Sequence, residues 1–229
     1  MLFASFFQGF STVFSPTVCP GCGCPFSESA EQPCPWCRLH LPSALTPALQ
    51  NRLEAMLGQR FPFASALALA KFSSGGRVQK ILHEIKYLGG FQRAYGLGQD
   101  LGRGCAARGM APGRLVPVPL HPNKRKKRGY NQAEWIARGM ESVLGWKVDT
   151  ELLHRIHEAG SQTKLTSQER QRNALQQFEC TRPADPYTHW IVVDDMITTG
   201  STLESCARAL RAAGAVHISA VALACDLDL

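Results

Sequence analysis

The hydrophobic pattern of this chain changes repeatedly between the spacing of a helix and the spacing of a strand. One helical face consists of four apolar residues in a short segment, namely Val78, Ile81, Leu82 and Ile85. Ile191 to Val193, in contrast, is a continuous apolar run, which is typical of a strand buried on both faces of a parallel sheet. Strands that alternate with helices predict an α/β fold with a central, mostly parallel sheet.

The same pattern predicts the other elements. Further helices are expected at residues 48–57, 92–108, 132–144 and 201–213, and further strands at residues 64–72, 115–120 and 217–224. Pro117 and Pro119 fall within one of these strands. Because proline has no N–H to donate to a neighbouring strand, that strand is expected to lie at an edge or to end there.

Changes in composition divide the chain into three predicted parts. Residues 1–40 hold an apolar start and a cysteine-rich segment, residues 41–60 form a connection, and residues 61–229 carry the alternating pattern. The chain has 229 residues, of which 45% are apolar, so it can bury a substantial core. Residues 1–18 lack the basic start of a signal peptide, and we expect them to pack on the body as a short helix or strand. No stretch has the roughly 18 apolar residues of a membrane span, so none is expected.

Four of the nine cysteines form two closely spaced pairs, Cys19 with Cys22 and Cys34 with Cys37. Each Cys-x-x-Cys pair can present two thiolates from one tight turn, and two such turns supply the tetrahedral shell of a structural Zn²⁺. The spacing therefore predicts a zinc site with these four ligands. Cys24, which lies beside the first pair, is a possible substitute ligand.

A redox-active dithiol and a set of disulfides are the alternatives to zinc. A redox pair usually opens a helix after a strand and needs only one Cys-x-x-Cys, whereas two pairs occur here in surroundings rich in Pro, Ser and Glu. The remaining cysteines are expected to be buried apolar residues, at Cys105, Cys180, Cys206 and Cys225. A thiolate zinc site with unpaired cysteines elsewhere is typical of a reducing compartment, so a cytoplasmic location is expected.

Two acidic residues and a hydroxyl-rich turn follow the apolar run at Ile191. Asp194 and Asp195 come at its carboxyl end, the edge at which open α/β sheets bind ligands. Two carboxylates there can accept hydrogen bonds from a vicinal diol such as ribose O2 and O3. The turn adds hydroxyl groups and a glycine that permits close backbone approach, at Thr198, Thr199, Gly200, Ser201 and Thr202. Because a helix is expected to begin at Ser201, the turn also suits a phosphate.

These features together fit a ribose phosphate, and an ordinary strand–turn–helix with surface polar residues is the alternative. The segment resembles the phosphoribosyl pyrophosphate (PRPP) fingerprint of type I phosphoribosyltransferases, which is a hydrophobic strand, two acids and Thr-Thr-Gly-x-Thr. Every position from Ile191 to Thr202 matches. The resemblance implies that Asp194 and Asp195 hold the ribose hydroxyls, and that the turn holds the 5′-phosphate.

Positive charge gives a second chemical indication. The chain has a formal net charge of +7, and five consecutive basic residues occupy Lys124 to Arg128. The loop from His121 to Gln132 follows a predicted strand and precedes a predicted helix, so a parallel sheet places it on the same rim as Asp194. Cations and backbone donors suit a pyrophosphate. Arg128 and Gly129 are the preferred contacts because they lie nearest the helix start, and a solvated charge run is the alternative.

The order of motifs resembles the ComF/GntX family, in which a zinc finger precedes a phosphoribosyltransferase domain. The resemblance covers nearly the whole chain. Its pieces are the two cysteine pairs, Ile85-Lys86-Tyr87 with Gly89, residues 117–122, residues 128–133, Arg155 with Gln162 and Leu165, Arg170 with Asn173 and Phe178, and the acidic fingerprint. The length of the connection at residues 38–60 departs from the family pattern. The implied fold is that of a type I phosphoribosyltransferase, preceded by a small zinc module.

The resemblance also implies roles for residues outside the fingerprint. His121 to Gln132 corresponds to the pyrophosphate loop, and residues 155–173 correspond to the flexible loop that closes over PRPP. The implied PRPP contacts in these segments and before them are Lys86, His121, Arg128, Gln162, Lys164 and Arg170. The implied catalytic group is Asp194, Asp195, Arg128 and Arg170. Residues 166–169 also read as a capping box, so a structural role for Arg170 on a helix is the alternative. His154 and His157 are expected on a helix surface.

The expected activity is displacement of pyrophosphate from ribose C1 of PRPP by an acceptor that the sequence does not identify. Mg²⁺ and loop cations would stabilise the charge on the departing pyrophosphate. The alternative is a non-catalytic, cytoplasmic competence factor that binds single-stranded DNA through the zinc finger and the basic loop. The association of the family with competence and DNA utilisation implies single-stranded DNA or DNA-uptake machinery as partners. Only Tyr130 interleaves the basic run, which gives little surface for base stacking.

Overall fold

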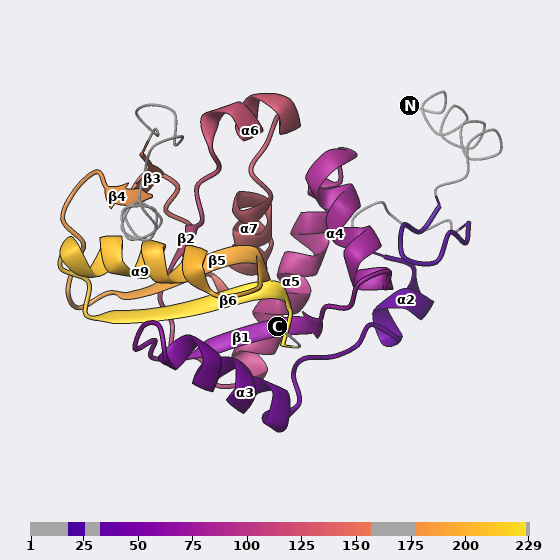
Figure 1. Ribbon diagram of the computed structural model, residues 1–229, viewed down its shortest axis with the longest axis horizontal. Coiled ribbons are helices and arrows are strands. Elements are labelled where there is room, and N and C mark those ends of the chain that lie inside the picture. The colour runs from indigo at the N-terminus through magenta and orange to yellow at the C-terminus, as the bar shows by residue number, and fades with distance from the viewer. Residues whose placement is uncertain (1–17, 26–32, 157–176, 228–229) are drawn as a thin grey trace, which may run out of the picture.

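Four parallel strands form the centre of the molecule (Figure 1). The computed structural model describes residues 18–25, 33–156 and 177–227. The strands lie in the order β1 (Ala66–Lys71), β6 (His217–Cys225), β5 (His189–Ile197) and β2 (Arg114–Pro117). All three neighbouring pairs are parallel, as register pairs such as Val192 with Ala220 and Val116 with Val192 show. The expected α/β fold with a parallel central sheet is confirmed.

Helices cover both faces of this sheet and bury a separate core on each. One face packs against α4 (Arg77–Tyr87), α5 (Phe91–Ala107) and α7 (Gln132–Leu144). The other packs against α3 (Pro47–Gly58) and α9 (Ser201–Ala212). The apolar run of β5 serves both cores, because successive side chains of a strand point to opposite faces. Ile191 lies in the first core and Val192 in the second, and both are fully buried.

Short segments of chain cover both edges of the sheet. At the β2 edge, Leu115 N–H donates to the Lys147 carbonyl (2.9 Å), and Asp149 N–H donates to the Leu115 carbonyl (2.8 Å). At the β1 edge, Ala44 N–H donates to the Leu69 carbonyl (3.1 Å). Pro117 is the last residue of β2, an end strand in the sheet order, as the missing proline donor requires.

Four further elements do not follow from the hydrophobic pattern. The basic segment contains a short helix, α6 (Pro122–Arg128), so the expected loop from His121 to Gln132 is partly helical. Another short helix, α2 (Pro35–Leu39), follows the second cysteine pair. Strands β3 (Leu153–Arg155) and β4 (Phe178–Cys180) form a small antiparallel sheet. The expectation of a helix at His154 is therefore wrong: this residue lies in β3, and its Nε2 is 3.0 Å from Glu179 Oε1.

The predicted connection at residues 41–60 contains α3, which is integrated into one face of the sheet through the fully buried Leu53 and Leu57. The division of the chain into residues 1–40, 41–60 and 61–229 stays a prediction. Among the described residues, no helix is both long and apolar enough to cross a membrane.

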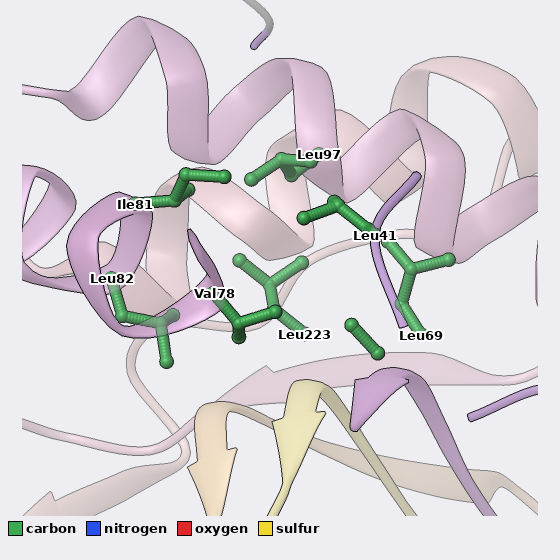
Figure 2. Close-up of a pocket in the computed structure, with 8 residues that line it drawn as sticks. Leu41, Leu69, Val78, Ile81, Leu82, Leu97 and Leu223 are labelled. Carbon is green, nitrogen blue, oxygen red and sulfur yellow. The ribbon is translucent and has the colours of Figure 1, made fainter. Parts of the chain in front are cut away.

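A small apolar pocket lies between α4, α5 and the sheet (Figure 2). Its lining is entirely apolar and consists of Leu41, Leu69, Ala70, Val78, Ile81, Leu82, Leu97 and Leu223. None of the acidic, basic or hydroxyl residues singled out in the sequence contributes to it. The chemistry of this chain must therefore be sought at the carboxyl ends of the strands.

Candidate functional site

The acidic pair lies near the carboxyl end of β5, directly before a bend and a helix. The strand continues to Ile197, so it is longer than expected and carries Asp194 and Asp195 within it. Residues 198–200 form the bend, and α9 begins at Ser201 with Gly200 as its N-cap. The hydroxyl-rich bend therefore lies at a helix N-terminus, where backbone N–H groups and the helix dipole favour an anion.

Gly200 is required at this bend for two reasons. Its φ angle of 78° lies in the left-handed region, which side chains of L-residues rarely adopt. A Cβ at this position would also lie 2.5 Å from Leu57 Cδ2 at the end of α3. The bend is thus held closely against α3, while the neighbouring residues Thr198, Thr199, Ser201 and Thr202 are exposed. The Thr199 and Ser201 hydroxyl oxygens are 3.2 Å apart, so they can exchange a hydrogen bond.

Asp195 lies in a network that joins four elements. Its Oδ2 is 2.6 Å from Lys86 Nζ on α4, and its Oδ1 accepts a hydrogen bond of 3.3 Å from Gln132 Nε2 on α7. Arg128 on α6 donates from Nη1 to Gln132 Oε1 at 3.0 Å. The Arg128 guanidinium carbon also lies 5.0 Å from the centre of the Tyr87 ring. The fold therefore gathers two predicted phosphate contacts, Lys86 and Arg128, around one predicted sugar ligand.

Asp194 points to the opposite face of the sheet. It is 9% exposed, and its Oδ1 accepts a hydrogen bond of 2.8 Å from the Asp195 N–H. Burial in this position, followed by the charge of Asp195, raises the pKa of the Asp194 carboxyl well above its ordinary value. On the same face, burial and then the charge of Asp194 raise the pKa of the Cys206 thiol of α9. The two carboxylates therefore reach the rim from different faces of the sheet.

The other predicted contacts differ in how far the structure describes them. His121 is the N-cap of α6, where its Nδ1 accepts a hydrogen bond of 3.2 Å from the Asn123 N–H. Lys124 to Lys127 are exposed on α6. Gln162, Lys164 and Arg170 lie outside the described residues. Arg155, at the start of the predicted flexible loop, ends β3 and donates to Gln177 Oε1 at 2.7 Å.

Two residues of the Asp195 network were not assigned a site role from the sequence. Gln132 begins α7 and bridges Arg128 to Asp195, and Tyr87 ends α4 beneath the Arg128 guanidinium. Both lie within motif pieces of the family resemblance, Ile85-Lys86-Tyr87 and residues 128–133, although no role was assigned to them there. Their place in these pieces, close to the candidate cations Lys86 and Arg128, was the available signal.

The two cysteine pairs meet as the spacing predicts. The four Sγ atoms of Cys19, Cys22, Cys34 and Cys37 all lie within 4.8 Å of one another, and Cys22 Sγ is 3.6 Å from Cys34 Sγ. Four sulfurs bound to one Zn²⁺ at about 2.3 Å would be roughly 3.8 Å apart in a tetrahedron. Cys24 is exposed and lies outside this group of four. Every cysteine of the chain lies in the described part, and none of the nine forms a disulfide.

The surroundings of the cysteine cluster also fit a zinc ion. Backbone N–H groups of Cys34 and Cys37 donate to Cys19 Sγ and Cys34 Sγ, both at 3.5 Å, which stabilises negative charge on sulfur. A Cβ on Gly21 would lie 2.9 Å from Cys37 Sγ, so the first turn leaves room only for glycine there. The cluster can therefore hold zinc without rearrangement, and it can also dock on the main body. Arg38 pairs with Asp100 of α5 at 2.9 Å, and Arg77 of α4 lies over the Trp36 ring at 4.2 Å.

Two solved structures share a distant likeness in fold. They are titled structure of the allosteric regulatory enzyme of purine biosynthesis, and glutamine PRPP amidotransferase from B. subtilis complexed with ADP and GMP. Each covers 61% of this chain at 18% identity with a TM-score of 0.41, and the match spans 29% and 30% of those longer chains.

Comparison with known sequences finds homologues for most of the chain. No family model matches it. The DNA utilization protein YhgH of Salmonella typhimurium is 28% identical over 210 residues, which are 88% of this chain and 81% of the relative, and the Escherichia coli (strain K12) protein gives the same values. Competence protein F of Haemophilus influenzae is 31% identical over 115 residues, 49% of this chain and 50% of the relative. The chain is thus a homologue of DNA utilization protein YhgH and of Competence protein F, as its resemblance to the ComF/GntX family predicts.

Proposed function

We propose that this protein binds PRPP and is a phosphoribosyltransferase-like protein linked to DNA uptake or nucleotide utilisation. One observation carries the proposal: Asp195, with Lys86 and Arg128 gathered around it, and the hydroxyl bend at the start of α9 lie in one strand–turn–helix. A diol acceptor, cations and an anion-binding bend are the three groups that a ribose phosphate with a pyrophosphate needs. The names of the homologues support the link to DNA.

The residues have distinct roles in this proposal. Asp194 and Asp195 accept hydrogen bonds from the ribose hydroxyls, and the bend from Thr198 to Thr202 binds the 5′-phosphate. Lys86 and Arg128 face the pyrophosphate, where negative charge grows as the bond to ribose C1 breaks. Mg²⁺ bound to the pyrophosphate would neutralise part of that charge. Because Lys86 already pairs with Asp195 at 2.6 Å, it is positioned to move between the carboxylate and the ligand.

Calorimetric titration of the zinc-loaded protein with PRPP and Mg²⁺ tests the proposal. We expect saturable binding that is weakened at least tenfold in the double variant Asp194→Asn with Asp195→Asn. Asp185→Asn is the matched control, since it neutralises an exposed carboxylate shortly before the amino end of the same strand. Absence of binding at millimolar PRPP, or equal affinity of the double variant and the wild type, would reject the proposal. Pyrophosphate release across nucleobases and ammonia then tests turnover.

Binding of single-stranded DNA is the second candidate function, and one observation favours it. Figure 1 shows α6 projecting from the body. This helix carries four exposed basic residues, and aromatic rings lie close to its last residue, Arg128, and to Tyr130 just after it. Tyr87 is 61% exposed under Arg128, and the Phe91 ring lies 5.8 Å from that of Tyr130. Exposed rings next to cations can stack bases while the cations contact phosphates.

Fluorescence anisotropy with a labelled single strand at two salt concentrations tests this second function. We expect affinity that falls as salt rises, and that falls further when Tyr87 is replaced by Ala. Salt-independent or undetectable binding would leave PRPP as the only proposed ligand. Tyr187→Ala is the control, because Tyr187 is 93% exposed but belongs to a different surface, in the turn before β5.

A further inference from the structure

A buried glutamate beside the hydroxyl bend holds two arginines, one on each oxygen. Glu204 lies in the first turn of α9 and is 7% exposed. Arg208 Nη2 lies 2.9 Å from its Oε1, and Arg60 Nη1 lies 3.4 Å from its Oε2. We infer that Arg60 is a further ligand-binding residue, which contacts the terminal phosphate of the sugar ligand at the α9 bend. The inference rests on the proposed function and extends it to a segment that no motif covers.

Arg60 reaches the bend because α3 packs directly against it. Its Cδ and Nε lie 3.4 Å and 3.8 Å from the position that a Cβ on Gly200 would occupy. Gly200 is the N-cap of α9, so the Arg60 guanidinium flanks the N–H groups that open the helix. The side chain is 38% exposed, which leaves it accessible to a ligand.

The charges of this group favour an additional anion. One carboxylate and two guanidinium groups leave a surplus of one positive charge next to the bend. If Arg60 turns to a phosphate, Glu204 keeps its partner Arg208, so no buried carboxylate is left without a cation. The contact to Arg60 is also the longer of the two. Arg60 is therefore the partner that a phosphate can recruit with the smaller loss, and Arg208 is a positioning residue that holds Glu204.

The inference predicts what the site discriminates. A guanidinium at the bend adds a charge-assisted contact to a pentose that carries a terminal phosphate, and adds nothing to an unphosphorylated one. The pyrophosphate end of PRPP faces Lys86 and Arg128 instead. Ribose 5-phosphate and inorganic pyrophosphate therefore probe the two ends of the site separately.

Calorimetric titration of Arg60→Gln, Arg208→Gln and the wild type with PRPP, ribose 5-phosphate and pyrophosphate tests the inference. Arg60→Gln and Arg208→Gln each remove one positive charge and one ion pair of Glu204, so the two variants are matched. We expect Arg60→Gln to weaken PRPP and ribose 5-phosphate by about tenfold or more, with pyrophosphate unchanged. Arg208→Gln leaves Arg60 as the only cation beside Glu204, so it should weaken PRPP and ribose 5-phosphate by less than Arg60→Gln does, with pyrophosphate unchanged. Arg60→Lys, which keeps the charge but not the fork, should fall between the wild type and Arg60→Gln.

The possible results separate this inference from the proposed function. Wild-type binding of PRPP with unchanged ribose 5-phosphate affinity in Arg60→Gln overturns the role of Arg60 and leaves the proposed function standing. Equal losses for ribose 5-phosphate and pyrophosphate, or equal losses in Arg60→Gln and Arg208→Gln, also overturn it. Failure of the wild type to bind PRPP rejects both. Thermal unfolding of each variant shows whether a loss of affinity reflects a loss of folded protein. We expect Arg60→Gln to lower the unfolding temperature by no more than Arg208→Gln does.

Discussion

The cysteine cluster and the acidic rim of β5 are both built from short motifs, but they are held together in different ways. The buried residues of the cysteine cluster are the cysteines themselves, at Cys19, Cys34 and Cys37. The acidic rim stands on a sheet with a large apolar core on each face. We therefore expect the first region to owe its order to a bound metal ion, whereas the packing of the whole domain shapes the second.

Removal of zinc gives the largest expected difference between the two regions. Structural zinc sites bind with apparent free energies of about 10–16 kcal/mol, so Cys37→Ser or a strong chelator should remove the order of residues 18–25 and 33–40. The sheet should persist, because none of its core residues is a ligand. Hydrogen–deuterium exchange measures both regions in one experiment. Cys24→Ser is the control and should retain bound zinc, and loss of zinc from that variant would show that the four assigned ligands are wrong.

Gly200→Ala should give the next largest effect, and on the acidic rim alone. The alanine must adopt a φ of 78°, and its Cβ meets Leu57 Cδ2 at 2.5 Å. Strain and overpacking together should lower the free energy of unfolding by about 2–4 kcal/mol. Gly109→Ala is the control, because Gly109 has a φ of 67° but nothing within 4 Å of an added Cβ. Equal losses in chemical denaturation would show that the contact with α3 is unimportant.

Asp194→Asn should change how stability depends on pH. The folded state raises the pKa of Asp194 above its ordinary 3.8, so the folded state binds the proton more strongly than the unfolded state. The stabilisation that the protonated Asp194 carboxyl contributes is fully present below pH 3.8, and it is lost as the pH rises through the raised pKa of the folded state. Asparagine cannot ionise and so removes that loss, and at pH 7 the variant should be more stable than the wild type. Denaturation at a series of pH values checks the slope.

Asp185→Asn is the control, because it should change the stability at neutral pH in the opposite direction to Asp194→Asn. A hydrogen bond from the Thr188 hydroxyl, followed by one from the Tyr187 N–H, lowers the pKa of Asp185. Its contribution is present above pH 3.8 and disappears as pH falls, so the asparagine variant should lose stability at neutral pH rather than gain it. The same direction in both variants would contradict the assignment of Asp194 as a buried carboxyl.

Arg77→Gln should have the smallest effect, confined to the contact between the two regions. The Arg77 guanidinium lies 4.2 Å from the centre of the Trp36 ring, and such contacts at exposed positions contribute about 0.5–1 kcal/mol. We expect faster hydrogen exchange in α2, with unchanged exchange in the sheet. Arg138→Gln, which breaks a surface pair with Glu134 on α7, should leave α2 unchanged. A global loss of stability in Arg77→Gln would mean that the two regions unfold together.

The sequence predicted those parts of the molecule whose motif or hydrophobic pattern lies within a short stretch of consecutive residues. The apolar run at Ile191, the acidic pair and the start of α9 lie within a dozen consecutive residues, and the cysteine turns are equally short. Helix α7 begins and ends at the predicted residues because Asn131 caps its start and Gly145 its end. The apolar spacing between them fixed the length.

Contacts between distant segments were not predictable in this way. Nothing in the sequence near Asp195 indicates Gln132 as its partner, 63 residues earlier in the chain, and Arg60 is 144 residues from Glu204. Helix α6 was missed because it has no buried residue and hence no apolar period, although Pro122 at its first turn was a usable signal. Strands β3 and β4 are too short for alternation to be recognised.

The contact between Lys86 and Asp195 has a consequence for which small molecules can enter. Each oxygen of the Asp195 carboxylate already has a partner, the Lys86 ammonium on one and the Gln132 amide on the other. An incoming sugar must therefore displace both groups before its hydroxyls can donate hydrogen bonds to this carboxylate. An evicted ammonium needs a new counter-ion. PRPP brings one in the same molecule, whereas a plain nucleoside does not, and the resting protein should therefore ignore nucleosides.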